Sequence, residues 1–239
     1  MGTRGLQAGL IILGIDTSCD DTSVAEVEAG RKIRSNIISS QVDLHQKYGG
    51  IVPELASRKH VELINYIIDE ALEAAGISLA DLDAIAVTNR PGLIGALLVG
   101  VSAAKSLSYC YDLPLLGINH VEGHIYAPYM EHDQLTFPHI CLTVSGGHTL
   151  LVEVPAGWQN YQVLGSTQDD AAGEAYDKVA KYLGLGFPGG KVIDDLAQQG
   201  QATAVHFPRP MLNSGNYQFS YSGIKTCLLY TSPSPRDRG

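Results

Sequence analysis

The order of the apolar segments constrains the fold of this chain more than any other feature of its sequence. Residues 10–17 form a continuous run rich in leucine and isoleucine, which predicts a buried strand. Pro53 begins a long amphipathic pattern that stops at Gly76, which predicts a helix between them. The expected elements of this half are strands at 10–17, 24–28, 33–39, 85–88 and 115–118, and helices at 53–75 and 96–109.

The second half continues with a new set of elements. They are a helix starting near His120, a hairpin of strands at 140–144 and 149–154, and helices at 171–183 and 191–199. Three strands, then helix–strand–helix–strand, then a fresh hairpin is the order of the actin-like ATPase (ASKHA) architecture, which has two α/β lobes with a cleft between them. We therefore predict an α/β chain of this fold, with a complete first lobe and an incomplete second lobe.

The composition of the chain changes abruptly near its end. After Cys227 the sequence becomes polar and rich in proline, serine and arginine, which is also typical of a disordered native tail. We favour foreign sequence read through after a C-terminal truncation, because the second lobe has barely begun there. The predicted parts are an N-terminal extension at 1–9, a first actin-like lobe at 10–135, a partial second lobe at 136–227 and a non-native tail at 228–239.

The charge of the chain argues against a broad nucleic-acid-binding surface. The net charge is −9 and the pI is about 5.3, whereas phosphate contacts come from clustered lysine and arginine. Any RNA role therefore needs a local basic patch or a partner. The four cysteines lack CxxC spacing, and the apolar run at 10–15 is too short for a signal peptide or a membrane span. These features predict a cytoplasmic protein without membrane association.

Two histidines four residues apart form the candidate metal site. His120 and His124 stand on one face of the predicted helix, where both imidazoles reach a single ion. With eight histidines in the chain, such a pair also arises by accident, and a stable site needs at least one further ligand. Glu122 is two residues after His120, unlike the His-Glu-x-x-His order of zinc proteases. Five other histidines are interpreted as surface or hydrogen-bonded residues: His45, His60, His132, His139 and His206.

A glycine-rich turn between two predicted strands is the candidate anion site. Ser145-Gly146-Gly147 is either a tight hairpin turn or a backbone nest for phosphate, with hydroxyls of the preceding strand as further donors. Asp16 follows the first strand at the equivalent place of the other lobe. It either positions a ligand or metal-bound water, or caps a turn.

Acidic residues of the second half form a third candidate group. Asp169 or Asp170 is expected to cap the helix at 171–183. Asp177 lies within that helix, where capping cannot explain it. Gly190 and Asp194 belong to a segment that suits a close approach of backbone to a ligand, with a carboxylate to accept hydrogen bonds from hydroxyls.

Taken in order, these segments resemble the TsaD/Gcp family, the catalytic subunit of bacterial tRNA N6-threonylcarbamoyladenosine synthesis. The match covers about residues 10–227. It rests on Gly14-Ile-Asp-Thr-Ser-Cys-Asp-Asp-Thr22, Gly49-Gly-Ile-Val-Pro-Glu-Leu-Ala-Ser-Arg58, Pro91-Gly-Leu-Ile-Gly-Ala-Leu-Leu-Val-Gly100, His120-Val-Glu-Gly-His124, Val144-Ser-Gly-Gly-His-Thr149, Asp169-Asp-Ala-Ala-Gly-Glu-Ala-Tyr-Asp-Lys178 and Phe207-Pro-Arg-Pro210.

The resemblance implies an activity and a set of ligands. The family transfers a threonylcarbamoyl group from threonylcarbamoyl-AMP to N6 of adenine 37 in tRNAs that read codons beginning with A. Its metal ion, Fe²⁺ by resemblance with Zn²⁺ as the alternative, is held by the residues matching His120 and His124 and by a downstream aspartate. Its partner subunits are TsaB and TsaE. The implied substrate contacts are Thr143, Val144, Ser145, Gly146, Gly147, Asp177, Gly190 and Asp194, with a downstream asparagine.

The downstream aspartate and asparagine do not occur in this chain, and no catalytic side chain is assigned. Two other interpretations stay open beside the transferase. One is a metalloprotease, against which the position of Glu122 argues. The other is an inactive truncated fragment or scaffold subunit of the same actin-like fold, against which the retained His120 and His124 argue.

Overall fold

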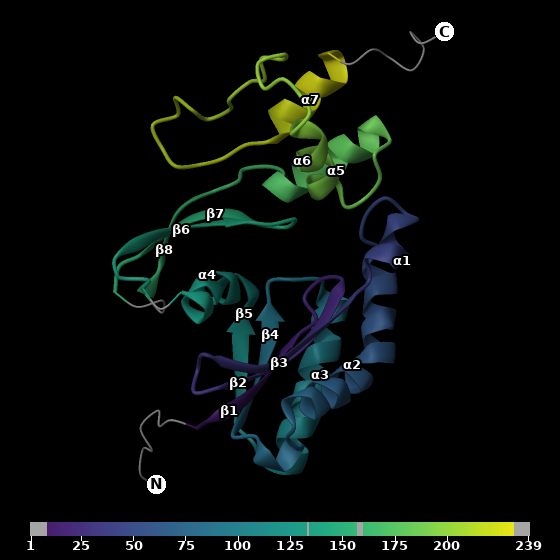
Figure 1. Ribbon diagram of the computed structural model, residues 1–239, viewed down its shortest axis with the longest axis vertical. Helices are drawn as coiled ribbons and strands as arrows, with labels where there is room; N and C mark the ends of the chain where they lie inside the picture. The colour runs from purple at the N-terminus through teal and green to yellow at the C-terminus, as the bar shows by residue number, and fades with distance from the viewer. Residues whose placement is uncertain (1–8, 133, 157–159, 232–239) are drawn as a thin grey trace. The chain divides into compact units, whose positions relative to one another are not determined.

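The computed structural model describes residues 9–132, 134–156 and 160–231, which divide into two compact units (Figure 1). Unit 1 comprises residues 1–45 and 51–135, and unit 2 comprises residues 46–50 and 136–239. Residues 1–8 of the predicted extension and 232–239 of the predicted tail lie outside the described residues.

Unit 1 is built on a five-stranded sheet with the order β3-β2-β1-β4-β5. The strands β1, β4 and β5 run parallel, β2 pairs antiparallel with β1, and β3 pairs antiparallel with β2. The elements are β1 (Ile11–Asp16), β2 (Asp21–Glu28), β3 (Lys32–Ser40), α1 (Val42–Gln46, whose last residue belongs to unit 2), α2 (Pro53–Ala75), η1 (Leu79–Asp81), β4 (Ala84–Arg90), α3 (Ile94–Tyr111), β5 (Leu115–Asn119) and α4 (His120–Glu131). Because parallel strands end at the same edge, the residues after β1, β4 and β5 gather there.

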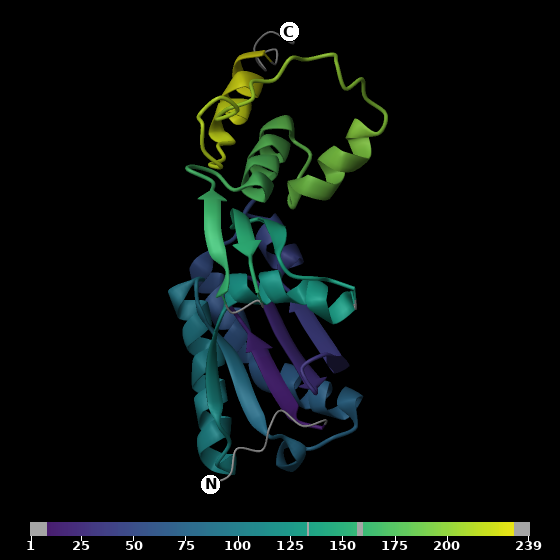
Figure 2. The ribbon, with the colours of Figure 1, turned by 90° about the vertical axis from the view of Figure 1, so that its left-hand side faces the viewer.

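Helices α2 and α3 lie side by side along one face of this sheet (Figures 1 and 2). The alternation of β1 turns Ile11, Leu13 and Ile15 toward the helices, where they are buried in the core of the unit. As the sequence predicts, α2 starts at Pro53 and ends before Gly76, whose φ of 66° suits glycine. The 3.6-residue period and the end signals of this helix were therefore sufficient to locate it.

Helix α3 is the one helix in the described part of the chain that is long and apolar enough to cross a membrane. Length and apolar composition are shared by core helices of soluble proteins, so a single such helix is a weak indication of a membrane span. In this structure α3 packs on α2 and on β4, and its buried residues are small: Ala96, Gly100 and Ala104. Small residues on that side allow a close approach of the helix to its neighbours.

Unit 2 combines a three-stranded antiparallel sheet, in the order β6-β7-β8, with three helices. Its elements are β6 (His139–Val144), β7 (Thr149–Val154), β8 (Gln162–Ser166), α5 (Ala172–Leu183), α6 (Gly189–Ala197) and α7 (Ser222–Thr231). The hairpin of β6 and β7 confirms the prediction, whereas the sequence reasoning missed β8 and α7. The predicted start of α6 at residue 191 was wrong, because Gly189 and Gly190 already belong to the helix.

The core of unit 1 contains one carboxyl group with an incomplete set of partners. Glu26 on β2 is fully buried, and Ser35 on the neighbouring strand donates its hydroxyl to Oε2. Among the described residues, Oε1 of Glu26 is the one buried side-chain nitrogen or oxygen atom without a hydrogen-bond partner. Burial raises the pKa of Glu26, and the Ser35 hydrogen bond and the Arg34 charge offset that rise in part.

We predict that Glu26→Gln raises the melting temperature at neutral pH by about 2–4 °C, as expected for about 1 kcal/mol in a chain of this size. A carboxyl whose pKa is raised by folding stabilises the fold below its unfolded value near 4.5, and this contribution is lost as the pH rises through the folded pKa. Melting curves between pH 4 and 8 test this expectation. Glu28→Gln is the control, since Glu28 lies half-buried on the same strand in an ion pair with Lys32. An unchanged or lower melting temperature of Glu26→Gln at neutral pH would contradict the prediction.

Candidate metal centre and anion-binding turn

The parallel part of the sheet in unit 1 brings Asp16 to the predicted histidine pair. Asp16 is the last residue of β1, and His120 is the first residue of α4, directly after β5. Oδ2 of Asp16 accepts a hydrogen bond from Nδ1 of His120 at 2.9 Å. Two roles were considered for Asp16 from the sequence, positioning a ligand or capping a turn. The structure shows a contact of each kind, since Oδ2 contacts the candidate metal ligand His120 and Oδ1 accepts the amide of Ser18 at 2.7 Å.

The two imidazoles of the predicted pair turn their Nε2 atoms toward each other. These atoms are 3.1 Å apart, and the rings meet edge to face with centroids 4.5 Å apart. The i, i+4 spacing places both rings on one side of α4, as predicted. Asn119 caps this helix, since its Oδ1 accepts the amide of Val121 at 2.9 Å. The Asn119 cap therefore fixes the start of α4 at His120, next to Asp16.

This arrangement suits a metal ion on the histidine pair. Two imidazole nitrogens bound to one tetrahedral Zn²⁺ at about 2.0–2.1 Å lie about 3.3 Å apart, close to the 3.1 Å between the Nε2 atoms here. A carboxylate on the far nitrogen of a ligating histidine fixes its tautomer and raises its basicity, and Asp16 has that position on His120. Across the described ranges, no group of three or more His, Cys, Asp or Glu side chains is arranged to hold a metal.

The titration of the neighbouring groups agrees with this assignment of roles. Burial alone would raise the pKa of Asp16, but hydrogen bonds from His120 and Ser18 hold it below its usual value, so the group is a carboxylate. Burial and the adjacent Asp20 raise the pKa of the Cys19 thiol to about 12. The Cys19 thiol is therefore neutral at physiological pH in the metal-free chain, which argues against a role as an activated thiolate nucleophile.

In unit 2 the predicted glycine turn lies against the start of α5. The amide of Ser145 donates to the carbonyl of His148 at 2.8 Å, which closes the turn between β6 and β7. The amide of Gly173, in the first turn of α5, donates to the carbonyl of Ser145 at 3.1 Å. A Cβ atom on Gly173 would lie 2.7 Å from that carbonyl oxygen, so this contact requires glycine.

The glycines of the turn itself face open space. A Cβ atom on Gly146 or Gly147 would meet no atom within 4 Å. Neither glycine is thus explained by packing, and neither has the positive φ that demands glycine. Open space over a backbone turn next to a helix N-terminus suits an approaching anion. The neighbouring residues of the predicted site are Thr143, which is buried, and Val144, which is exposed.

The structure gives the acidic pair at 169–170 a role other than the predicted one. The residue before α5 is Ala171, so neither aspartate caps this helix, and that prediction was wrong. Asp169 instead accepts the amides of Tyr221 at 2.7 Å and Ser222 at 3.3 Å at the start of α7. Asp170 forms ion pairs with Lys178 at 2.6 Å and Lys225 at 2.9 Å. Both aspartates therefore attach α7, which the sequence reasoning did not identify as an element.

Asp177, which helix capping within α5 did not explain, contacts the next helix. Its Oδ1 accepts the amide of Gly189, the first residue of α6, at 2.7 Å. A Cβ atom on Gly189 would lie 2.4 Å from Cβ of Ala180, so α5 and α6 approach closely at this point. Gly190 faces open space, and Asp194 lies exposed one turn further along α6. Asp177 thus has a structural contact in addition to its predicted substrate contact.

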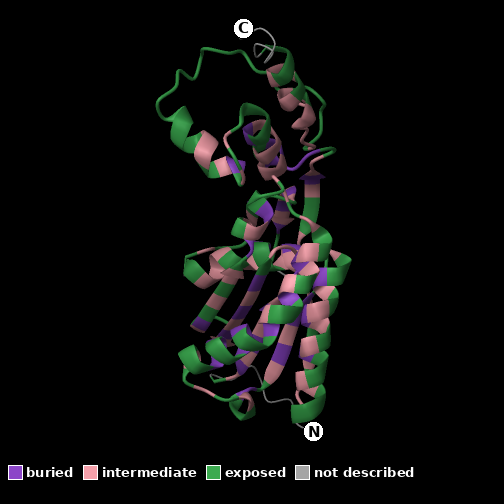
Figure 3. Ribbon diagram, turned by 90° about the vertical axis from the view of Figure 1, so that its right-hand side faces the viewer, coloured by how far each residue is buried: buried purple, intermediate pink, exposed green. Residues whose placement is uncertain are grey.

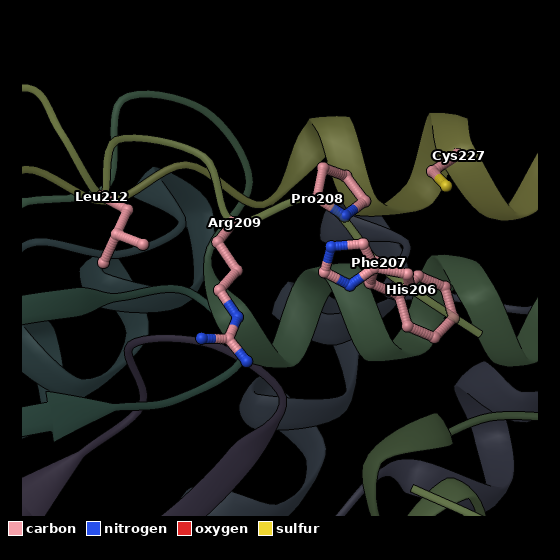
Figure 4. Close-up of a pocket in the computed structure, with 6 residues that line it drawn as sticks. All are labelled: His206, Phe207, Pro208, Arg209, Leu212 and Cys227. Carbon is pink, nitrogen blue, oxygen red and sulfur yellow. The ribbon is translucent and has the colours of Figure 1, made fainter. Parts of the chain in front are cut away.

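A separate open pocket of about 660 Å³ lies in unit 2 between the loop after α6 and α7 (Figure 4). Its six lining residues include none of those predicted for the site; they are His206, Phe207, Pro208, Arg209, Leu212 and Cys227. Residues 198–217 are almost entirely exposed (Figure 3), and five of the six lining residues belong to this segment.

Comparison with known proteins gives a consistent family. A family model described as TsaD, tRNA N6-adenosine threonylcarbamoyltransferase, matches residues 32–233. A curated relative of that name from Clostridium perfringens (strain SM101 / Type A) is 54% identical over 219 residues, which cover 92% of this chain and 64% of the relative. Another from Syntrophotalea carbinolica is 54% identical over 227 residues, or 95% and 66%. The chain thus spans a little less than two thirds of the length of these relatives.

A solved structure confirms the predicted fold class. The (R)-2-hydroxyglutaryl-CoA dehydratase component A of Acidaminococcus fermentans aligns with 96% of this chain and 71% of its own, with a TM-score of 0.50 and 15% identity. At this identity the likeness shows the fold alone. The architecture is the α/β actin-like ATPase fold expected from the order of the elements.

Proposed function

The chain belongs to the TsaD family of tRNA N6-adenosine threonylcarbamoyltransferases, and on this basis we propose that it acts in t6A synthesis. The reaction transfers the threonylcarbamoyl group of threonylcarbamoyl-AMP to N6 of adenine 37 in tRNAs that read codons beginning with A. The observation that carries the proposal is the pair of facing Nε2 atoms on His120 and His124, 3.1 Å apart, with the Asp16 carboxylate behind His120.

The chemistry of the reaction explains what such a centre supplies. An exocyclic adenine amine is a weak nucleophile because its lone pair is delocalised into the ring, so the acyl group arrives activated as a mixed anhydride with AMP. A divalent ion bound there, Fe²⁺ or Zn²⁺, would supply Lewis-acid chemistry, namely polarisation of an acyl oxygen and stabilisation of developing negative charge. His120 and His124 would hold this ion, and Asp16 keeps His120 in the tautomer whose Nε2 carries the lone pair.

The substrate contacts proposed from the family resemblance all belong to unit 2. We assign phosphate binding to the amides of Gly146 and Gly147, because both glycines face open space at the start of α5. Thr143, Val144, Ser145, Asp177, Gly190 and Asp194 complete the proposed substrate contacts. The Ser145 hydroxyl accepts the amide of His148 at 3.0 Å, so this side chain also stabilises the turn.

The acidic charge of the chain makes partners part of the proposal. With a net charge of −9, the chain is expected to bind tRNA through a local patch and through the family partner subunits TsaB and TsaE. Binding to phosphates through such patches weakens steeply with salt, so salt-independent tRNA binding by this chain alone would contradict this assignment. We place the protein in the cytoplasm, where tRNA is modified.

The direct test combines the chain with threonylcarbamoyl-AMP, the partner subunits and a tRNA that reads codons beginning with A. Digestion of the tRNA and mass analysis of its nucleosides should reveal threonylcarbamoyladenosine. We expect His120→Ala to abolish the product, and Gly123→Ala to retain it, because a Cβ atom at Gly123 meets no atom within 4 Å. Full activity of His120→Ala after treatment with a chelator would rule out the metal-assisted mechanism.

A further inference from the structure

A hydrogen-bonded network of buried polar side chains connects the start of α2 to the loop that follows β1. It consists of Gln41, His45, His60 and Thr22, all of which are buried, and the two histidines are fully buried. None of them is a predicted site residue. Buried polar groups in folded proteins are hydrogen-bonded. Each end of this network is a backbone group that can only donate or only accept, and these two groups determine the direction of the hydrogen bonds between them.

The first fixed end is the amide of Val52, which donates to Nδ1 of His45 at 3.2 Å. An amide can only donate, so Nδ1 of His45 carries no proton and the ring proton is on Nε2. Nε2 of His45 then donates to Oε1 of Gln41 at 3.3 Å. This contact fixes the orientation of the Gln41 amide, whose NH₂ group faces the other way.

The second fixed end is the carbonyl of Cys19, which can only accept. Nε2 of His60 lies 3.0 Å from this oxygen and must therefore donate. Nδ1 of His60 is consequently an acceptor, and it receives the Thr22 hydroxyl at 2.7 Å and, more weakly, Nε2 of Gln41 at 3.5 Å. The donors thus run in one direction from Val52 through His45, Gln41 and His60 to Cys19.

The Cys19 carbonyl belongs to the same loop as the residues that hold His120. Ser18 next to it approaches Nδ1 of His120 at 3.2 Å through its hydroxyl, and its amide donates to Asp16 at 2.7 Å. The Ser18 carbonyl accepts the amide of Leu93 at 2.8 Å, and Thr17 donates to the carbonyl of Ala96 at 2.8 Å. His60 is the side chain that holds the next peptide of this loop, at Cys19.

We propose that His60 is a positioning residue for the histidine pair: by donating to the Cys19 carbonyl it holds the loop in the form that presents Asp16 and Ser18 to His120. The metal role of the pair rests on the proposed function, whereas the effect of His60 on the His120 tautomer does not. Asp16 accepts from Nδ1 of His120, so that nitrogen carries the proton. His120 is therefore in the opposite tautomer to His45 and His60.

The test compares two isosteric substitutions in the whole chain. In His60→Gln the amide nitrogen replaces Nε2 and keeps the donor to Cys19, whereas in His60→Asn it replaces Nδ1 and cannot reach that carbonyl. Ile64→Val, one turn further along α2 and buried, is the control for a general loss of packing. The two measurements are the imidazole ¹⁵N chemical shifts, which report the tautomers, and Co²⁺ titration followed by visible absorption.

We expect the wild-type shifts to report Nε2–H for His45 and His60 and Nδ1–H for His120. In His60→Asn the Nδ1–H form of His120 should decrease and Co²⁺ should bind about tenfold more weakly, the lower end of the effect of a residue behind a ligand. His60→Gln and Ile64→Val should keep the Nδ1–H form of His120 and a Co²⁺ affinity within about threefold of the wild type. Co²⁺ spectra of His60→Asn should also lose intensity or shift, which a merely less stable fold would not produce.

Two results would overturn the proposal, and a third would separate it from the metal assignment. An Nδ1–H tautomer of His60 in the wild type would remove its donor to Cys19, and this measurement does not depend on how the variants fold. The same His120 tautomer in His60→Asn as in the wild type would show that His60 does not position the loop. If the wild type binds no Co²⁺ while His60→Asn still changes the His120 tautomer, the metal assignment fails and the positioning role stands.

Discussion

His124→Ala is expected to weaken Zn²⁺ binding by more than about 100-fold, because loss of a residue behind a ligand already costs 10–100-fold and this change removes a ligand. The Nε2 atoms of His120 and His124 lie 3.1 Å apart, so a single ion can contact both, and neither ring replaces the other. Isothermal titration calorimetry of the purified chain near neutral pH measures the difference in affinity. A decrease of less than about threefold would contradict the assignment of His124 as a ligand.

Gly123→Ala is the matched control for that experiment. Gly123 lies between the two histidines on α4, and an added Cβ atom would meet nothing within 4 Å. Alanine has a higher helix propensity than glycine by about 1 kcal/mol. The control should therefore bind Zn²⁺ like the wild type and melt at a slightly higher temperature. A loss of binding in the control would show that helix geometry, and not the His124 ligand, determines the result.

The second large effect is expected at the glycine turn of unit 2. In Gly173→Ala the new Cβ atom would lie 2.7 Å from the Ser145 carbonyl oxygen and 2.8 Å from Cα of Gly146. Both are backbone atoms that cannot rotate away, so the turn must move. Overpacking of this kind costs about 1–3 kcal/mol, which exceeds the roughly 1 kcal/mol that alanine contributes to a helix. We expect a melting temperature several degrees lower and loss of binding to AMP, used as the probe for the adenylate.

Gly146→Ala separates ligand binding from stability at the same turn. Its Cβ atom meets no protein atom within 4 Å, so the melting temperature should stay within about 1 °C of the wild type. The methyl group would occupy the space proposed for the phosphate, and AMP binding should weaken at least about tenfold, a loss of about 1.4 kcal/mol. Unchanged AMP affinity in Gly146→Ala would show that the ligand does not approach this turn.

Most of the regular elements could be predicted because their signals are local. The helix from Pro53 to Ala75 has a proline at its start, glycine in the left-handed region after its end and a regular apolar face. The strands β1, β6 and β7 were each read from short apolar runs bounded by turn residues. The positions of His120 and His124 on one side of a helix also followed from spacing alone, and the structure confirms this geometry.

Two of the missed features of the candidate site depend on contacts between residues far apart in the sequence. The contact of Asp16 with His120 spans 104 positions, and its one sequence signal was that both residues follow strands that end at one edge of a parallel sheet. Asp169 was expected to cap α5, yet it caps α7, more than 50 positions away. Its short polar side chain favours a cap, but the sequence does not say which helix receives it.

The buried histidines illustrate the same limit from another side. His45 and His60 were interpreted as surface or hydrogen-bonded residues because neither has a neighbouring metal-ligand pattern. Both are hydrogen-bonded and fully buried. Burial of a histidine depends on the helix and loop that surround it, and only the folded chain brings Gln41, Thr22 and the Cys19 carbonyl to these rings. The position of His60 on the apolar side of α2 was the one sequence feature that indicated burial.

We propose that the two imidazoles of α4 hold one cation together. X-ray absorption at the Zn K edge of the Zn²⁺-loaded chain counts imidazole ligands directly through their outer-shell scattering. We predict two imidazole nitrogens at about 2.0–2.1 Å in the wild type, and one in His124→Ala loaded at high Zn²⁺ concentration. The same number of imidazole ligands in both proteins, or none in the wild type, would contradict the proposal that His120 and His124 bind one cation together.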